Sequence, residues 1–235
     1  MADIVLLHGA WHGGWCWRAT AEMLRARGHR VTTPTQTGLG ERRHLLSREI
    51  TLETFARDLI EHLAYEDLSG AVLVGHSFGG NAISVAAERV PERVRRLVYL
   101  DSLVLGPGES PFSRLPDEVV ESRRAAAMAH DGGLSIPCPP AESFGVVEPA
   151  QAEWLTRMMT PHPLGVFDSP IPLTGAPGAG FDPVYVVCTE PVYGPLVSSR
   201  ERVRAAGWRV TELPAGHDAM VTAPEALADL VEREA

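Results

Sequence analysis

A single serine stands between two glycines in the stretch LVGHSFGGNA, residues 73–82. The pentapeptide GHSFG, with Ser77 at its centre, fits the G-x-S-x-G pattern, in which a tight strand-to-helix turn exposes a serine hydroxyl. A continuous apolar run precedes the pattern and helix-forming residues follow it, which is the context that such a turn requires. The sequence therefore predicts that Ser77 is a nucleophile rather than a helix cap or a phosphate ligand.

A serine nucleophile needs a base, because its hydroxyl is weakly nucleophilic at neutral pH. The chain has nine histidines, and His217 lies in the loop PAGHDAM near the C-terminus, where the chain order serine, acid, histidine places the base. We therefore predict that His217 accepts the proton of Ser77. Asp218, the next residue, is expected to anchor the loop, and His8 and His76 to shape the pocket or support loops rather than transfer protons.

Acyl transfer also needs hydrogen-bond donors for the oxygen that becomes negatively charged. The backbone N–H of Phe78 follows the nucleophile at the start of a helix, and the backbone N–H of Ala10 lies in the first HGA loop. Both are predicted donors. The residues predicted to bind substrate are Gly9, Trp11, His76 and Trp154. Further apolar side chains that are candidates for the pocket are Trp15, Trp17, Phe112, Phe144 and Met158.

Composition excludes several other classes of protein. All 21 basic residues are arginine, so a lysine Schiff base and a phosphate-binding P-loop lysine are excluded. The formal net charge of −9 disfavours nucleic acid and anionic membranes as partners. Cys16, Cys138 and Cys188 lack metal-ligand spacing and are expected to be reduced thiols. We therefore expect a cytoplasmic enzyme with no metal or cofactor, no signal peptide and no membrane span.

Strands alternate with helices along most of the chain, which predicts an α/β protein with a mostly parallel sheet. The pattern breaks over residues 103–183, which hold 13 of the 19 prolines. We interpret 103–183 as a cap or lid inserted into a core made of 1–102 and 184–235. Strands are predicted at 4–7, 29–34, 71–75, 95–101, 184–188 and 208–214. Helices are predicted near 15–27, 51–65, 78–89, 117–130, 149–159, 197–206 and 224–234.

With LLHGAWHGGWCW, GHSFGG, LVYLDS and GHDAM in this order, the chain resembles the α/β-hydrolase superfamily. The similarity is closest to the branch of plant methylesterases of the salicylate-binding protein type, hydroxynitrile lyases and bacterial esterase relatives. This resemblance implies an α/β-hydrolase fold, with helices on both faces of the sheet and a cap inserted after the sixth-strand position. It also implies a homodimer as one option, and it supports the roles given above to Ser77, His217, Ala10 and Phe78.

The triad acid departs from the plant pattern. Plant members place an aspartate just after the strand corresponding to VYVVC, where this chain has Pro191, which cannot act as an acid. Several α/β-hydrolases take the acid from the end of the preceding strand, so the resemblance favours Asp101, at the end of RRLVYLD. A capping role is the alternative for Asp101, and Glu190 is the alternative acid.

The favoured function is a serine hydrolase of small carboxylic esters, working through an acyl-enzyme. A thioesterase, a lactonase or a cofactor-free cyclase keeps the same triad and is an alternative. A non-catalytic binding protein on the same fold is another. Cyanogenic lyase activity is disfavoured, because the lyases of this branch use a threonine and a lysine where this chain has Gly9 and Asp218.

Overall fold

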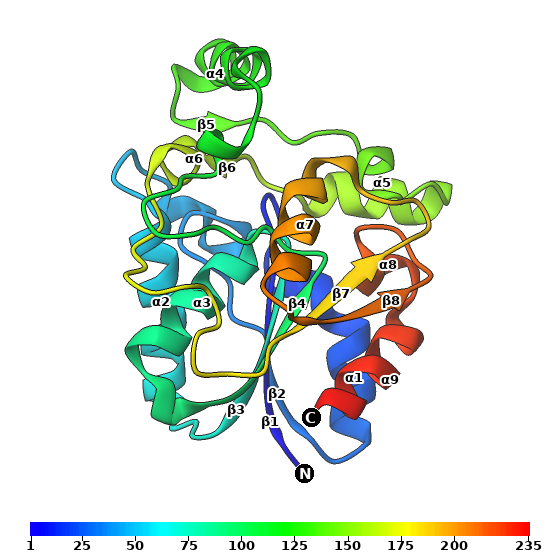
Figure 1. Cartoon of the computed structure of the whole chain (residues 1–235). Helices are drawn as coiled ribbons and strands as arrows, with labels where there is room; N and C mark the ends of the chain where they lie inside the picture. The colour runs from blue at the N-terminus through cyan, green and yellow to red at the C-terminus, as the bar shows by residue number, and fades with distance from the viewer.

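The computed structural model describes all residues from 1 to 235 and contains a six-stranded sheet. The sheet lies at the centre of the molecule, between helices (Figure 1). The strand order is β2-β1-β3-β4-β7-β8, and every neighbouring pair is parallel. All carboxyl ends of the strands therefore lie at one edge, where open parallel sheets bind their ligands. The strands are β1 (Asp3–Leu7), β2 (Arg30–Thr32), β3 (Ala71–His76), β4 (Val94–Leu100), β7 (Val184–Cys188) and β8 (Arg209–Leu213).

Helices cover both faces of the sheet because its central strands are apolar on both sides. Successive side chains of β1 alternate between two cores: Val5 and Leu7 pack on one face, Ile4 and Leu6 on the other. The first face is covered by α2 (Leu52–Tyr65), α3 (Gly79–Arg89) and α7 (Val197–Ala205). The second is covered by α1 (Arg18–Ala26), α8 (Ala219–Thr222) and α9 (Pro224–Glu234).

The segment 103–183 crosses the carboxyl edge of the sheet, with α4 standing highest above it (Figure 1). Its strands β5 and β6 pair antiparallel and form a separate two-stranded sheet. It consists of α4 (Asp117–Asp131), β5 (Ser135–Ile136), α5 (Pro149–Met158), β6 (His162–Pro163) and α6 (Leu164–Asp168). This segment therefore lies where it can enclose a ligand held at the ends of β1, β3 and β4.

The predicted α/β-hydrolase architecture with a parallel sheet is confirmed, and the differences lie in short elements. A 3-10 helix, Gly14–Trp17, precedes α1, so that helix begins at Arg18 rather than near residue 15. The two-residue strands β5 and β6, together with α6 and α8, were not predicted. Elements of two to five residues are too short to show a hydrophobic period, because one helical turn already takes 3.6 residues.

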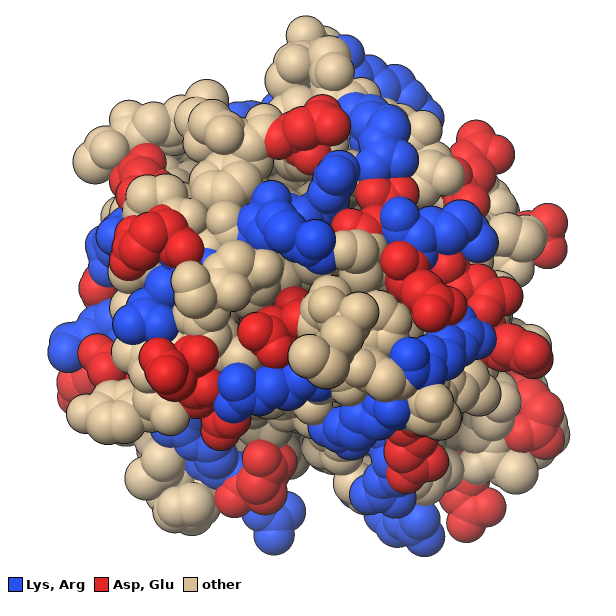
Figure 2. Space-filling model, turned by 90° about the horizontal axis from the view of Figure 1, so that it is seen from below, with Lys and Arg blue, Asp and Glu red and all other residues tan.

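The face of the molecule at the amino ends of the strands carries acidic and basic side chains interspersed with one another (Figure 2). Opposite charges that alternate over short distances largely cancel beyond a Debye length of about 10 Å. This face therefore has no continuous patch of one sign. None of the helices combines the length and the apolar character needed to cross a bilayer.

Candidate active site

Ser77 lies at the tip of the turn between β3 and α3, with a left-handed backbone φ of 52°. Three backbone hydrogen bonds hold the turn: the Ser77 N–H donates to Leu100 O (3.1 Å), and Ser77 O accepts from the N–H groups of Gly80 (3.2 Å) and Leu103 (3.0 Å). A non-glycine residue rarely adopts this conformation, and such strain persists only where the surroundings impose it. The turn thus presents the Ser77 hydroxyl at the carboxyl edge of the sheet.

The glycines on either side of Ser77 allow this turn to form. A Cβ atom on Gly75 would lie 2.8 Å from the backbone of Gly79, and one on Gly79 would lie 2.7 Å from Leu7 O. The HGA loop (residues 8–10) approaches Ser77 as closely, because a Cβ on Gly9 would lie 2.7 Å from Ser77 Cβ. Backbone atoms and the Cβ of Ser77 cannot move aside as the far end of a flexible side chain can, so these positions exclude larger residues.

His217 and Asp101 form a buried pair beside this turn. The Nδ1–H group of His217 donates to Asp101 Oδ2 over 2.7 Å, while His217 is 2 % and Asp101 0 % exposed. This hydrogen bond fixes the imidazole in the tautomer whose Nε2 carries a lone pair, as a general base requires. Asp101 follows β4 directly and has a left-handed φ of 39°, so this residue, like Ser77, lies on a strained turn at a strand end.

A third residue, Arg200 on α7, completes this charged cluster. Its Nη2 donates to Asp101 Oδ1 over 2.9 Å, so each oxygen of the carboxylate has one partner. Arg200 is 5 % exposed, which makes this an ion pair removed from water. A buried carboxylate held at both oxygens keeps one orientation, since rotation would break one bond or the other.

Ser77 and His217 are not hydrogen-bonded to each other in this structure, but they line adjoining cavities. Ser77 lines a small cavity of about 40 Å³, and His217 lines a larger one of about 600 Å³. Four residues line both cavities: Trp11, Arg123, Tyr193 and Pro195. Because bonds of this kind are often long without substrate, the arrangement fits a site that tightens when a ligand binds.

The predicted oxyanion donors lie on the two loops that meet at Ser77. The backbone N–H groups of Ala10 and Phe78 donate to no acceptor within the protein. Phe78 is the N-cap residue of α3, where N–H groups have no partner within the helix and the helix dipole favours negative charge. Both donors are therefore free to bind an oxygen of a ligand.

The loop that carries His217 is fixed by a second buried pair. Asp218 Oδ2 lies 2.8 Å from His12 Nε2, and His12 Nδ1 lies 2.6 Å from the carbonyl oxygen of Ala10. Both ring nitrogens of His12 thus face acceptors, which suits an imidazolium. Burial alone would lower the pKa of His12, but the Asp218 carboxylate and the hydrogen bond to Ala10 O together outweigh burial and raise it. This pair ties the loop that carries His217 to the loop that carries Ala10.

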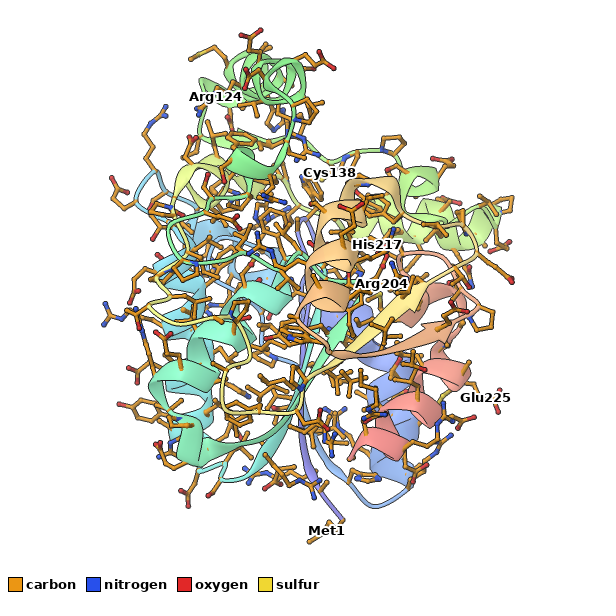
Figure 3. The ribbon with its side chains drawn as sticks, in the orientation of Figure 1. Met1, Arg124, Cys138, Arg204, His217 and Glu225 are labelled. Carbon is orange, nitrogen blue, oxygen red and sulfur yellow. The ribbon has the colours of Figure 1, made fainter.

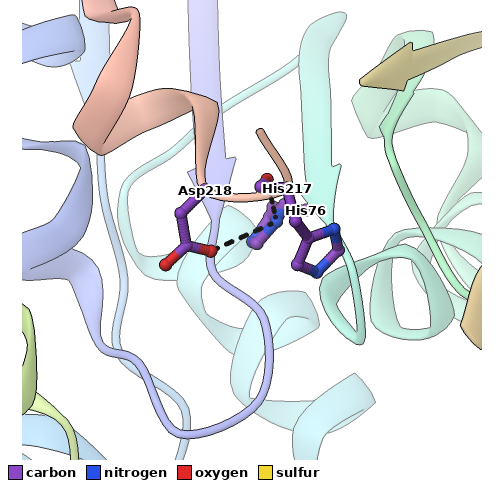
Figure 4. Close-up of side chains that lie close together, drawn as sticks. All are labelled: His76, His217 and Asp218. Atoms are coloured by element: carbon purple, nitrogen blue, oxygen red, sulfur yellow. Dashed lines mark hydrogen bonds and ion pairs between the residues drawn. The ribbon is translucent and has the colours of Figure 1, made fainter. Parts of the chain in front are cut away.

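His76, at the end of β3, supports the same loop from below (Figure 4). Its Nε2 lies 3.0 Å from the carbonyl oxygen of His217 and 3.9 Å from Asp218 Oδ1. His76, His217 and Asp218 place ligand-type atoms within 4.8 Å of one another, a spacing that a metal ion could use. However, a nitrogen that faces a carbonyl oxygen carries hydrogen and offers no lone pair. The cluster therefore fits a role in positioning the loop.

Three fully buried histidines, called here the neutral histidines, are held without charge: His8, His76 and His162. Burial lowers the pKa of His8 to about 3 and the pKa values of His76 and His162 well below their ordinary value. His8 Nε2 accepts from the N–H of Gln36, and His162 Nδ1 accepts from that of Trp11. These side chains are fixed parts of the site rather than proton carriers.

Aromatic side chains enclose the imidazole of His217. The ring of Tyr193 stacks on it with centroids 4.0 Å apart and planes 18° apart, and Phe144 lies 6.1 Å away in a similar orientation. Trp11 joins the core to the segment above, because its indole N–H donates to the carbonyl oxygen of Ile136 in β5. Figure 3 shows His217 at the level where these two parts meet, below Cys138. The imidazole of His217 is thereby screened from bulk water.

The structure gathers most, but not all, of the residues predicted for the site. Asp101 contacts His217, whereas the alternative acid Glu190 is exposed and makes no hydrogen bond to the imidazole. Trp11 lines both cavities, and Gly9 lies against Ser77. Trp154, predicted to bind substrate, lies elsewhere: it packs edge-on against Trp15, with ring centroids 5.3 Å apart, and lines a separate surface cavity. Helix α5 directs this tryptophan toward α1, away from Ser77.

Four residues of the site were not singled out for these roles by the sequence: His12, Arg123, Tyr193 and Arg200. Each acquires its partners from a distant part of the chain; Arg200 lies 99 positions from Asp101, and His12 lies 206 from Asp218. No local pattern encodes such pairs. For His12, the second HG in HGAWHGG was the one available signal.

Known proteins are similar to this chain over nearly its whole length. A family model described as "Alpha/beta hydrolase family" matches residues 4–230. A carbendazim hydrolyzing esterase from Nocardioides sp. is 40% identical, over 97% of this chain and 98% of that protein. A pyrethroid hydrolase from Sphingobium wenxiniae is 28% identical, over 98% of this chain and 86% of that protein.

Among solved structures, one similar chain is an extracellular α/β-hydrolase from a Paenibacillus species, described as sharing structural and functional homology with tobacco salicylic acid binding protein 2. It superposes with a TM-score of 0.82 at 25% sequence identity, over 100% of this chain and 99% of that one. The whole length of the chain, including the segment 103–183, therefore has a counterpart in that structure.

Proposed function

We propose that this chain, which belongs to the alpha/beta hydrolase family, hydrolyses small carboxylic esters through an acyl-enzyme formed on Ser77. The observation that carries the proposal is the buried hydrogen bond between His217 Nδ1 and Asp101 Oδ2, next to a serine on a strained turn. The esterase that is 40% identical over nearly the whole chain supports the same reaction class.

In the first half of the reaction, the Ser77 hydroxyl attacks the ester carbonyl and His217 Nε2 takes the proton. Asp101 keeps the imidazole in the required tautomer and stabilises the imidazolium that forms. The N–H groups of Ala10 and Phe78 donate to the oxyanion, each contributing a few kcal/mol of transition-state stabilisation. His217 then gives its proton to the leaving alcohol, and the acyl group stays on Ser77.

In the second half, water enters with His217 as base, attacks the acyl-enzyme and releases the acid. The neutral histidines and the pair of His12 with Asp218 hold the two loops in place during both steps. We further propose that residues 103–183 act as the cap and select the substrate, since this segment contributes Phe144 and Arg123 to the cavities.

Hydrolysis of p-nitrophenyl acetate tests the reaction class. The wild-type protein is expected to release p-nitrophenol, and Ser77→Ala is expected to lose at least about 10³-fold in kcat. An acyl thioester with the same acyl group, assayed in parallel, compares ester with thioester cleavage. Binding of esters without turnover, unchanged in Ser77→Ala, would contradict the proposal and favour a binding protein.

Two further variants test which carboxylate is the acid. Asp101→Asn keeps the shape of the side chain but no longer specifies the imidazole tautomer, so kcat is expected to fall by roughly 10³- to 10⁴-fold. Glu190→Gln, at an exposed position, is expected to change kcat less than twofold. The reverse ranking of the two variants would assign the acid to Glu190.

A further inference from the structure

Arg123, on helix α4, lines the same small cavity as Ser77. It is one of the four residues that line both the cavity of Ser77 and the cavity of His217. Its guanidinium carbon lies 5.3 Å from the centre of the Phe167 ring, within the range of a cation–π contact. Phe167 itself lines the small cavity, so the charge is held on the wall of that cavity.

Arg123 has no carboxylate partner and donates no hydrogen bond within the protein, although its side chain is partly buried. The arginines around it are paired: Arg124 with Asp168, Arg114 with Glu109, and Arg200 with Asp101. Burial lowers the pKa of Arg123, and the nearby Tyr193 opposes this shift. A guanidinium stays charged under all ordinary conditions, so the protein holds a partly desolvated cation whose donors have no acceptor within the protein.

The walls of the two cavities offer no negative charge to neutralise Arg123. No aspartate or glutamate lines either of them, although the chain carries 30 acidic residues and a net charge of −9. The charged side chains on these walls are Arg123 and, in the small cavity, Arg114. Apolar walls reduce screening by water, so a negative group on a ligand would interact strongly with the guanidinium.

We propose that the natural substrate is an ester that also carries a carboxylate, and that Arg123 binds this carboxylate while Ser77 attacks the ester carbonyl. Arg123 is then a specificity-determining residue. The guanidinium presents two parallel N–H groups that match the two oxygens of a carboxylate. This inference rests on the proposed function, because it concerns which ester the same site prefers.

Two pairs of esters test the proposal, and in each pair a carboxylate is compared with the carboxamide of the same shape. In the first pair, mono-p-nitrophenyl glutarate and p-nitrophenyl glutaramate carry the carboxylate or the carboxamide on the acyl side. In the second, 3-carboxyphenyl acetate and 3-carbamoylphenyl acetate carry it on the alcohol side. The wild-type enzyme is expected to prefer the carboxylate at least tenfold in kcat/KM in one pair, mainly through a lower KM.

Arg123→Met keeps much of the apolar stem and removes the charge. It is expected to lower kcat/KM for the preferred carboxylate about 10- to 100-fold, and to change kcat/KM for the matching carboxamide less than threefold. Arg123→Lys should restore part of the preference. Arg124→Met is the matched control, because Arg124 lies next along α4 (Figure 3), is exposed and is paired with Asp168. In this control, kcat/KM should be unchanged for both the carboxylate and the carboxamide.

Equal losses on the carboxylate and the carboxamide in Arg123→Met, or no wild-type preference in either pair, would overturn the inference. In both cases the amide esters and p-nitrophenyl acetate would still be hydrolysed in a Ser77-dependent way, which leaves the proposed function standing. Failure of the wild-type protein to hydrolyse any ester would instead refute the proposed function itself.

Discussion

Replacing Arg200 by methionine tests how the buried carboxylate of Asp101 is held. Asp101 is fully buried, with Oδ2 on His217 and Oδ1 on Arg200 Nη2 at 2.9 Å. Methionine keeps the apolar stem but lacks the guanidinium, so it donates no hydrogen bond to Asp101. The variant leaves one oxygen of a buried carboxylate without a partner.

The expected loss follows from that unpaired oxygen. Removing one partner of a buried ion pair typically costs about 3 to 5 kcal/mol in the free energy of unfolding. A domain in the middle or upper part of the ordinary range of stability, about 5 to 15 kcal/mol, remains folded at room temperature after such a loss; urea unfolding of the variant measures what is left. Because Asp101 then keeps one of its two anchors, the imidazole is less well oriented, and kcat is expected to fall about 10- to 100-fold with little change in KM.

The assay combines urea unfolding with ester hydrolysis, with rates expressed per Ser77 that a fluorophosphonate can label. Arg200→Lys should recover much of kcat, because the observed pair uses a single N–H donor. Arg202→Met is the control: Arg202 lies on the same helix and pairs with Glu109 at a partly exposed site, so kcat should be unchanged and stability reduced by about 1 kcal/mol or less. A wild-type kcat and urea midpoint in Arg200→Met would refute this reasoning.

Three other predictions concern the loops around the site. Gly9→Ala places a Cβ 2.7 Å from Ser77 Cβ, so kcat for ester hydrolysis should fall about 10²-fold. An unchanged kcat would disprove the close approach of the two loops. The neutral histidines take up protons only on unfolding, so stability is lost as pH falls below about 6.5. Together these three groups should lower the free energy of unfolding by about 3 to 4 kcal/mol between pH 7 and pH 5.5, partly offset by His12. Urea titrations should therefore show a net loss, and a flat profile would contradict the lowered pKa values. The contribution of His12 has the opposite sign: its raised pKa stabilises the fold at low pH, and this is lost as pH rises through the folded pKa. Asp218→Asn should remove this contribution of His12 and lower the free energy of unfolding by about 3 kcal/mol below pH 6, measured by urea unfolding. A variant as stable as the wild-type protein would exclude the ion pair.

The parts of the fold that could be predicted from the sequence are those encoded over a few consecutive residues. The buried strand before Ser77 and the helix after it form one continuous pattern, and the glycines at 75 and 79 reflect contacts made within the same turn. The helices predicted near 117–130 and 149–159 also form, as α4 and α5, because each shows its pattern over several turns.

Contacts made in three dimensions could not be predicted in this way. Arg123 and Arg124 are adjacent and chemically identical, yet one faces the cavities and the other pairs with Asp168. Their difference arises from the orientation of α4 over the sheet, which depends on the packing of the whole segment. Trp154 shows the reverse case, since an aromatic residue in a helix is compatible with a pocket wall or with packing against another helix.

Covalent labelling by a fluorophosphonate tests the central claim most directly, because such a probe reacts with a serine only when a neighbouring base activates it. Intact-mass measurement of the wild-type protein should show addition of one probe, and peptide mapping should place it on Ser77. Ser77→Ala should remain unlabelled, and His217→Ala should react far more slowly. A folded wild-type protein that stays unlabelled, or that carries the probe on another residue, would contradict the proposal that Ser77 and His217 act together.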